Sequence, residues 1–385
     1  MDIIERAREL EPYIIEKRRD FHAHPELKYE EFRTSQIVKD ELESFGYETM
    51  EVADTGIIGI LRGKTGKVVA LRADMDALPI NEENEVSYRS TAPGKMHACG
   101  HDAHTAMLLG AAKILAEMRD ELNGTIKLIF QPAEEGGLGA KRIVEEGHLS
   151  DVNAIFGIHV WADLSPGTIG ITGGPLMASS DGFKVTIKGR GGHAALPHAS
   201  IDPIAAMVDV INGYQKIVSR ETDPLDPVVM SVTKISAGTA FNVIPESAEF
   251  GGTIRTFSKK RRDKTIKRMK EITENYATAM RCRGDFELSV EYIPSTTNDE
   301  RLADFARDVL KPAGEIVKPK LTFGSEDFAF YSQKVPGLFI LLGTGGVYQH
   351  HHPRFNVDES VLYKGSAIHA LLAYSYLSQS SGMNC

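Results

Sequence analysis

The chain has 385 residues, of which 42% are hydrophobic and 25% are charged, and this composition excludes a disordered, collagen-like or coiled-coil protein. Its length predicts two domains. Lys and Arg number 44 against 53 for Asp and Glu, a net charge of −9, which argues against nucleic acid or an anionic membrane surface as the main partner. No apolar stretch approaches the roughly 18 residues that a membrane-spanning helix needs.

The N-terminal segment and the cysteines predict a cytoplasmic protein. Residues 1–20 mix acidic with basic side chains and lack an apolar core, so we expect a surface helix there rather than a signal peptide. The cysteines, Cys99, Cys282 and Cys385, are few and widely spaced. They fit a reducing compartment without a disulfide framework.

The first part of the chain alternates predicted helices with predicted strands. Residues 31–45 carry apolar side chains at helical spacing, and Gly46 ends that helix. The elements that follow are strands at 56–62 and 67–73, a helix at 102–118, a strand at 125–130, a helix at 138–146 and an apolar run at 152–160. Because the strands are mostly apolar, we expect an α/β sheet that is covered on both faces.

The pattern changes near residue 180, where apolar and polar side chains alternate over 183–188 and predict a half-exposed strand. The next elements are a helix at about 202–220, strands at 228–235 and 247–255, a helix from Ser258 to about 281 and a strand at 286–293. The order β-α-β-β-α-β is that of a split-βαβ, ferredoxin-like unit, with helices on one face of an antiparallel sheet.

This order predicts an inserted domain. We expect a catalytic domain in two segments, 1–180 and 295–385, with a lid and dimerisation domain at 181–294 between them. The last helix, predicted at about 358–379, would return to the catalytic domain.

Potential metal ligands follow several predicted strands, whereas the phosphate loop, the nucleophile elbow and the H-E-x-x-H motif are missing from the sequence. Cys99 and His101 are separated by one glycine, which can turn both donors towards one centre. Thiolate and imidazole are ligands that zinc and its neighbours prefer. The alternative is a buried cysteine beside a histidine that begins a helix.

Three further donor sets lie at the ends of predicted strands. They are Glu134-Glu135, His159 and His350-His351-His352. Each set alone has a structural alternative: a solvated acidic loop, a strand-end histidine or an exposed histidine run. Four sets at four strand ends rarely coincide by chance, and together they supply enough ligands for two metal ions that share a bridging group. At a fifth strand end, Asp74 and Asp76 either bind metal or orient a ligand imidazole.

A series of short motifs, in a fixed order along the chain, resembles the pattern of a known family. The motifs are Arg18 to His22, His24 to Leu27, Leu71 to Pro79, His97 to Asp102, Phe130 to Glu135, Gly191 to Ala195, Asn242 to Pro245, Gly324 to Phe328 and His351 to Phe355. With them, essentially the whole chain resembles the dinuclear metal amidohydrolases of the aminoacylase/carboxypeptidase family. The most similar branch holds N-acyl-amino-acid, hippurate and auxin-conjugate hydrolases.

The resemblance implies a metallo-aminopeptidase-like α/β catalytic domain that binds two divalent metal ions. Zinc is the expected metal, with manganese, cobalt and nickel as alternatives. The implied ligands are Cys99, His101, Glu135, His159 and His351. By the same resemblance Cys99 bridges the ions, where the wider family uses an aspartate, and Glu134 takes the place of the general base.

Two departures from the family pattern matter for the ligands. The wider family has a His-x-Asp pair where this chain has Asp74 and Asp76. We therefore expect His101 to replace that histidine as a ligand, and both aspartates to orient the ligands without binding the metal. The usual Asn or Ser after the last ligand is His352 here. The choice of His351 over His352 therefore rests on the spacing to Phe355.

The resemblance also implies a substrate role for three residues of the inserted domain. His193 follows a glycine turn and, in relatives, such a histidine reaches the substrate carbonyl, often from the partner subunit. Arg255 would clamp the substrate carboxylate, and Asn242 would add hydrogen bonds. The alternative for Arg255 is an ion pair on the face of a strand.

The expected activity is hydrolysis of the amide bond of N-acyl-L-amino acids, with a metallo-carboxypeptidase acting on short peptides as the nearest alternative. A cysteine hydrolase using Cys99 and His101 would leave the other donor sets without a role, and a metal-binding scaffold would not need Glu134 and His193. We expect a cytoplasmic homodimer or higher homo-oligomer formed through the inserted domain, with no nucleic-acid or membrane partner.

Overall fold

The computed structural model describes residues 1–379, without the side chains of residues 289–291. Two compact units are present: Met1–Gly174 with Thr297–Lys320 and the chain from Asp327 form the first, and Pro175–Thr296 with Leu321–Glu326 form the second. Cys99 and Cys282 are buried free thiols, and Cys385 lies outside the described residues. Within residues 1–379, no helix has the length and apolar character needed to cross a membrane.

The first unit is built on an eight-stranded sheet in the order β1-β2-β4-β3-β5-β16-β6-β15. The strands are β1 (Glu48–Val52), β2 (Gly56–Arg62), β3 (Lys67–Asp74), β4 (Gly124–Gln131), β5 (Ala154–Trp161), β6 (Ile169–Gly170), β15 (Ile316–Val317) and β16 (Gly337–Gly343). Four central neighbours, β4, β3, β5 and β16, run parallel to one another. The prediction of an α/β fold with a large central sheet is confirmed.

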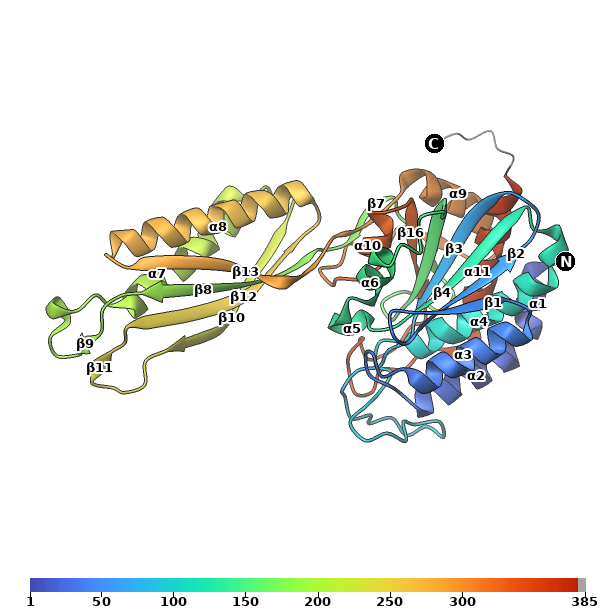
Figure 1. Ribbon diagram of the computed structural model, residues 1–385, viewed down its shortest axis with the longest axis horizontal. Coiled ribbons are helices and arrows are strands. Elements are labelled where there is room, and N and C mark those ends of the chain that lie inside the picture. Colours follow the sequence, from blue (N-terminus) through green and yellow to red (C-terminus); the bar gives the residue numbers. More distant parts are fainter. Residues whose placement is uncertain (380–385) are drawn as a thin grey trace. The chain divides into compact units, whose positions relative to one another are not determined.

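Helices cover both faces of this sheet. Its central strands are therefore buried along nearly their whole length. The helices are α1 (Ile3–Glu9), α2 (Glu11–Ala23), α3 (Phe32–Ser44), α4 (His101–Glu117), α5 (Glu134–Gly137), α6 (Gly139–Glu145), α9 (Glu300–Leu310), α10 (Ala329–Ser332) and α11 (Leu362–Ser378). Helix α4 is buried almost all round and packs against β3, α2 and α11, with α3 on the same side (Figure 1).

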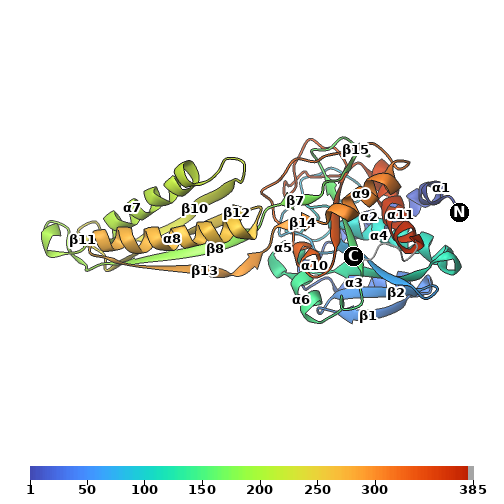
Figure 2. The ribbon, with the colours of Figure 1, turned by 90° about the horizontal axis from the view of Figure 1, so that it is seen from above.

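The second unit has a four-stranded antiparallel sheet in the order β10-β12-β8-β13. Its elements are β8 (Ser180–Lys188), β9 (Gly192–His193), α7 (Pro203–Lys216), β10 (Val228–Ala237), β11 (Val243–Ile244), β12 (Ser247–Thr256), α8 (Lys259–Ala279) and β13 (Arg283–Ile293). Helices α7 and α8 lie on one face of the sheet (Figure 2) and enclose a core of their own. The strands β7 (Gly174–Met177) and β14 (Thr296–Asn298) form a separate pair.

Local chemistry explains where several helices begin and end. Ser258 caps α8 as predicted, because its Oγ accepts a hydrogen bond from Arg261 N at 3.1 Å. The surface helix expected at 1–20 is instead two helices, since Pro12 at the start of α2 cannot continue a preceding helix. The helix expected at about 202–220 ends as α7 at Lys216 and continues as a wider π-helical turn.

Candidate metal centre

The carboxyl ends of the four parallel strands bring the donor sets of the sequence analysis to one edge of the sheet. Asp74 is the last residue of β3, and the Cys99–His101 segment comes later, at the start of α4, rather than at a strand end of its own as expected. The two glutamates follow β4, His159 lies near the end of β5, and the histidine run follows β16. Open α/β sheets place their ligands at this edge, because the loops after neighbouring parallel strands meet there.

A glycine in the left-handed conformation turns Cys99 and His101 inward. Gly100 has a φ of 95° and directly precedes α4, and a Cβ added to it would lie only 2.3 Å from Val160 Cγ2. Only glycine therefore fits between the two donors. Cys99 is 8% exposed and His101 is fully buried, so both side chains belong to the interior of the unit.

The five expected ligands form two groups that share the Cys99 thiol. Cys99, His101 and His159 make one group, and Cys99, Glu135 and His351 make the other; within each group the donor atoms lie within 4.8 Å of one another. Cys99 Sγ is 3.5 Å from His159 Nε2, and His351 Nε2 is 3.1 Å from Glu135 Oε1. A donor common to two groups is what a bridging thiolate requires.

One buried nitrogen of this cluster lacks a hydrogen-bond partner within the described part of the chain, and two other donors hold their protons more tightly than usual. His101 Nε2 is buried and has no hydrogen-bond partner among residues 1–379. Hydrogen bonds to Cys99 and Glu135 raise the pKa of His351 to about 10, and burial, with the charge of Glu135, raises the pKa of the Cys99 thiol. Both shifts keep protons on donor atoms, and metal ions compete with protons for those same atoms.

The geometry of the histidine run favours His351 as the donor. His350 is partly buried and its Nε2 donates a hydrogen bond to Val160 O at 3.0 Å. His351 and His352 are both exposed, but His352 stacks on Tyr348 whereas His351 Nε2 lies beside Glu135. His351 has a φ of 68°, a strained value for a residue other than glycine. Strain of this kind persists only where the surrounding structure imposes it, and it is common at binding sites.

Asp76 fixes the loop that carries the two glutamates. Its carboxylate oxygens accept hydrogen bonds from the backbone N–H of Glu134 at 3.0 Å and of Glu135 at 2.9 Å. Oδ1 of the same carboxylate lies 3.2 Å from His101 Nδ1. One side chain therefore contacts the imidazole of His101 and holds the backbone of both glutamates beside it.

Asp74 Oδ2 lies 3.7 Å from Nε2 of the proposed ligand His101, but both carboxylate oxygens of Asp74 have other partners. Arg72 Nη1 donates to Asp74 Oδ2 at 2.7 Å, and His104 Nδ1 lies 2.6 Å from Asp74 Oδ1. Because His104 Nε2 accepts a hydrogen bond from Val160 N, its Nδ1 carries the proton and donates to Asp74. Asp74 with His101 and His104 also has metal-binding geometry, but these hydrogen bonds give it a supporting place.

The three residues singled out in the inserted segment all lie in the second unit. His193 is exposed on β9 and pairs with Val243 of β11, and Asn242 O accepts a hydrogen bond from Ala194 N at 3.0 Å. These contacts bring His193 and Asn242 close together. Arg255 on β12 is half-buried and donates to Ser325 Oγ at 3.0 Å, and no carboxylate among the described residues forms an ion pair with it.

Residues 70–375 match the family model described as "Peptidase family M20/M25/M40". The chain belongs to this family. N-acetylcysteine deacetylase of Bacillus subtilis is 44% identical over 364 residues, which are 94% of this chain and 96% of the relative. Thermostable carboxypeptidase 2 of Saccharolobus solfataricus is 40% identical over 390 residues, which are 98% of this chain and 99% of the relative.

A solved structure of the same family is closely similar. The YXEP protein of Bacillus subtilis, described as a dinuclear metal binding peptidase from the M20 family, superposes with a TM-score of 0.88 at 40% identity, over 96% of this chain and 99% of its own. The resemblance stated from the sequence motifs is thus confirmed. This M20-family chain is a metal-dependent hydrolase that acts on amide bonds.

Glu31 is a site residue that sequence reasoning missed, since a single glutamate before a helix carries no motif. It is fully buried, and its carboxylate accepts hydrogen bonds from Thr55 Oγ1 at 2.6 Å and from Ala133 N at 2.9 Å. Ala133 directly precedes Glu134 and has a φ of 57°. In this M20-family chain Glu31 therefore holds the strained start of the glutamate loop.

The Glu31→Gln variant is expected to gain stability relative to the parent protein as the pH rises. Burial, with a contribution from the Asp76 charge, raises the pKa of Glu31 to about 7, although the Thr55 hydrogen bond lowers it. Since the folded state binds this proton more tightly than the unfolded state, the parent loses stability as the pH rises from about 4.5 to 7, and glutamine does not titrate.

Thermal unfolding at pH 5 and at pH 8 measures this difference. We expect the Tm of Glu31→Gln minus that of the parent to be larger at pH 8, by an amount equivalent to about 1–3 kcal/mol. The control is Glu30→Gln, because Glu30 is exposed and pairs only with Lys95. A Tm difference that is the same at both pH values would contradict the prediction.

Proposed function

We propose that the protein hydrolyses the amide bond of N-acyl-L-amino acids and releases a carboxylic acid and a free amino acid. The observation that carries the proposal is the pair of ligand groups sharing Cys99, with Glu134 beside them. The relative described as N-acetylcysteine deacetylase, which is similar over nearly its whole length, supports this choice of substrate.

Two divalent metal ions would be held by Cys99, His101, Glu135, His159 and His351, with Cys99 as the shared ligand. Zinc is the expected metal because the donors are thiolate, imidazole and carboxylate, and manganese, cobalt and nickel accept the same set. When bound, such ions polarise the substrate carbonyl and make an attacking water more acidic.

The chain's own groups would move the protons. Glu134 would take a proton from the attacking water and return it to the leaving amine, as a general base and then a general acid. The group is suited to this role because it is nearly buried and Asp76 fixes its backbone. His193 would donate a hydrogen bond to the oxygen that becomes negative in the transition state.

Asn242 and Arg255 would bind the amino-acid part of the substrate. A guanidinium group binds a carboxylate through two parallel hydrogen bonds. The absence of an ion pair to Arg255 among the described residues supports this role over that of a strand-face ion pair. Burial lowers the pKa of Arg255, so an arriving carboxylate would meet a partly desolvated positive charge.

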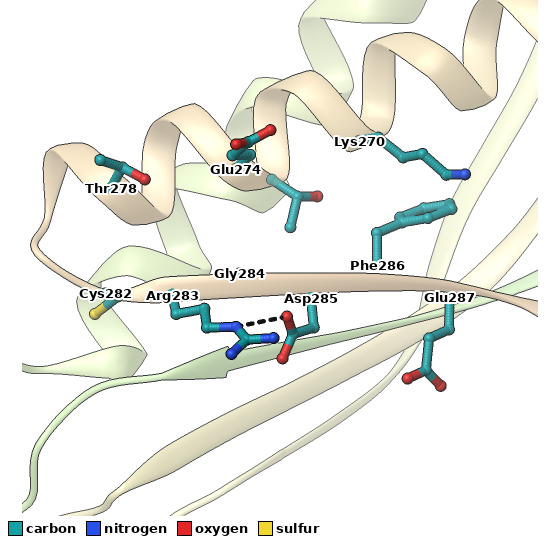
Figure 3. Close-up of a pocket in the computed structure, with 10 residues that line it drawn as sticks. Lys270, Glu274, Thr278, Cys282, Arg283, Gly284, Asp285, Phe286 and Glu287 are labelled. Atoms are coloured by element: carbon teal, nitrogen blue, oxygen red, sulfur yellow. Dashed lines mark hydrogen bonds and ion pairs between the residues drawn. The ribbon is translucent and has the colours of Figure 1, made fainter.

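We further propose that the second unit is a lid and dimerisation domain of a cytoplasmic homodimer, inserted at 181–294 between catalytic segments 1–180 and 295–385. The edge strand β13 supports this, because it has a single neighbour, β8, in its sheet. A groove of about 690 Å³ lies between β13 and α8 (Figure 3), lined by Phe286, Lys270 and Glu274 among others. The same strand of a second copy would extend the sheet there.

A metallo-carboxypeptidase is the second candidate. It uses the same chemistry with a peptide in place of the acyl group, and the relative described as thermostable carboxypeptidase 2 favours it. Turnover of N-acyl amino acids and of dipeptides by one preparation, compared by kcat/KM, decides between the two substrate classes.

Metal removal is expected to abolish the activity, and divalent metal ions should restore it. The protein is dialysed against a chelator, its metal content is measured by elemental analysis, and hydrolysis of N-acetyl amino acids is assayed before and after metal is added back. Because the carbonyl and the water both need the cations in the proposed reaction, full activity in verified metal-free protein would refute the proposed function.

A further inference from the structure

A buried network of charged side chains lies behind the proposed ligands and is not used by the proposed chemistry. Arg18 and His22 lie one turn apart on α2 and are 1% and 0% exposed. Arg18 Nε donates to Asp102 Oδ2 at 2.9 Å, and His22 Nδ1 lies 2.7 Å from the same oxygen. Asp102 directly follows His101 in the first turn of α4, so both contacts tie that turn to α2.

The same two side chains also contact Asn356 and Glu82, which lie in two other segments of the chain. Arg18 Nη2 donates to Asn356 Oδ1 at 2.8 Å, in the segment that follows His351. His22 Nε2 lies 2.9 Å from Glu82 Oε1. Through Asn84, which donates to Glu82 Oε1 at 3.1 Å and to Phe355 O at 3.0 Å, this second arm ends in the same segment as the first.

His22 acts as a double donor in this network. Burial and the nearby Arg18 lower the pKa of His22, but Asp102 and Glu82 outweigh them and raise it above its usual value. The imidazolium form carries a proton on each ring nitrogen, so it donates to both carboxylates. Each hydrogen bond therefore joins α2 to a different segment of the chain.

Stability alone is a weak reason for such a network. Taking several charges out of water costs free energy, and well-packed apolar side chains of similar volume are often as stable. Hydrogen bonds in such a network fix the orientation of the segments that they join, whereas apolar contacts are not directional. Metal binding needs such precision, because ligand distances must hold to about 0.2 Å while the donors come from separate loops.

We propose that Arg18 and His22 are positioning residues that hold the Cys99–His101 segment and the His351 loop in one metal-binding arrangement, acting through Asp102 and Asn356. The proposal rests on the proposed metal centre. It predicts that loss of these contacts weakens metal binding in a folded protein, and that excess metal recovers the activity.

Two substitutions of His22 separate the arms of the network. The amide of glutamine reaches the position of Nε2, so His22→Gln keeps a donor towards Glu82 and loses the one towards Asp102. The amide of asparagine reaches the position of Nδ1, so His22→Asn keeps a donor towards Asp102 and loses the one towards Glu82. A matched control is His24→Ala, because His24 caps the same helix, is partly exposed and has its side chain on Asp20.

The measurement is the affinity of each metal-depleted variant for Zn²⁺, in competition with a chromophoric chelator. Trp161 is the only tryptophan of the chain, and its ring centroid lies 5.7 Å from that of His159, so its fluorescence provides a second signal. Circular dichroism and Tm report whether each variant is folded.

We expect His22→Gln to bind Zn²⁺ about 10–100-fold more weakly than the parent, as for other residues that support metal ligands. His22→Asn should stay within a few-fold of the parent, because it keeps the bond to Asp102 and Arg18 still holds the segment after His351 through Asn356. His24→Ala should equal the parent, and saturating Zn²⁺ should restore the kcat of His22→Gln. A folded His22→Gln with parental affinity, or one whose affinity matches that of His22→Asn, would overturn the proposal.

If His22→Gln does not fold, Arg18→Lys decides the question. Lysine keeps the charge but cannot reach Asp102 and Asn356 together, so the same loss of affinity is expected, and parental affinity would overturn the proposal. A parent protein that binds no metal would instead refute the proposed function, and elemental analysis of the parent makes that outcome distinct.

Discussion

Glu134→Gln is expected to lower kcat by at least about 10²–10⁴-fold while the protein keeps its metal ions. The amide has nearly the shape of the carboxylate, and the hydrogen bond from Glu134 N to Asp76 is a backbone contact that the substitution leaves in place. The loop should therefore stay in position, and the variant should lack only the group that accepts the proton.

Glu135→Gln is the matched comparison, since it makes the same chemical change one residue further along. Glu135 Oε1 lies 3.1 Å from His351 Nε2, and the two are grouped with Cys99. Removing this charge should lower metal occupancy, and with it the activity. Metal content by elemental analysis and kcat at saturating metal separate the two effects.

The two variants can be told apart even though Glu134 also lies close to the proposed ligands, in a group with His101 and Glu135. If Glu134→Gln lost metal while Glu135→Gln kept it and lost turnover, the two roles would have to be exchanged. If neither variant changed kcat by more than a few-fold, no glutamate of this loop would act as the base.

His193→Ala is expected to fold, form dimers and bind metal normally while kcat falls by about 10²–10³-fold, the usual effect of losing one oxyanion donor. His193 is exposed, and its ring Nδ1 accepts a hydrogen bond only from the nearby Ala195 N. The substitution should therefore cost little stability. His198→Ala is the control, because His198 is also exposed in the same region, and it should keep parental activity.

Mixing two inactive variants tests whether His193 acts on the partner subunit. His193→Ala and Glu134→Gln proteins are combined under conditions that exchange subunits. If the histidine acts in trans, each mixed dimer has one intact site and one site with both defects, so about a quarter of the parental activity returns. If mixed dimers form and no activity returns, the histidine acts within its own chain or has no catalytic role.

The sequence by itself determined the order and type of most elements. The apolar runs at 125–130 and 152–160 became β4 and β5, and the alternating segment at 183–188 became part of β8. Periodicity and continuous apolar runs report how a segment is buried, and burial selects the element. Because parallel strands end at a common edge, the positions of the donor sets after predicted strands also indicated that these sets lie near one another.

Which histidine of the run lies beside the other proposed ligands depends on the tertiary structure. His350, His351 and His352 have the same chemistry, and their contacts separate them: His350 bonds to Val160 O, His352 stacks on Tyr348, and His351, which has a φ of 68°, lies beside Glu135. No local pattern predicts strain of this kind, since it exists only where distant segments meet.

The supporting residues depend on the tertiary structure even more. His104 bonds to Asp74, Glu31 to Ala133 and Arg18 to Asp102, and in each pair the partners are far apart in the sequence. A lone buried histidine, glutamate or arginine looks like any other until its partner is known. The sequence thus determined the elements and the kinds of donors, whereas the contacts between distant segments decided which side chains meet, because only folding brings those segments together.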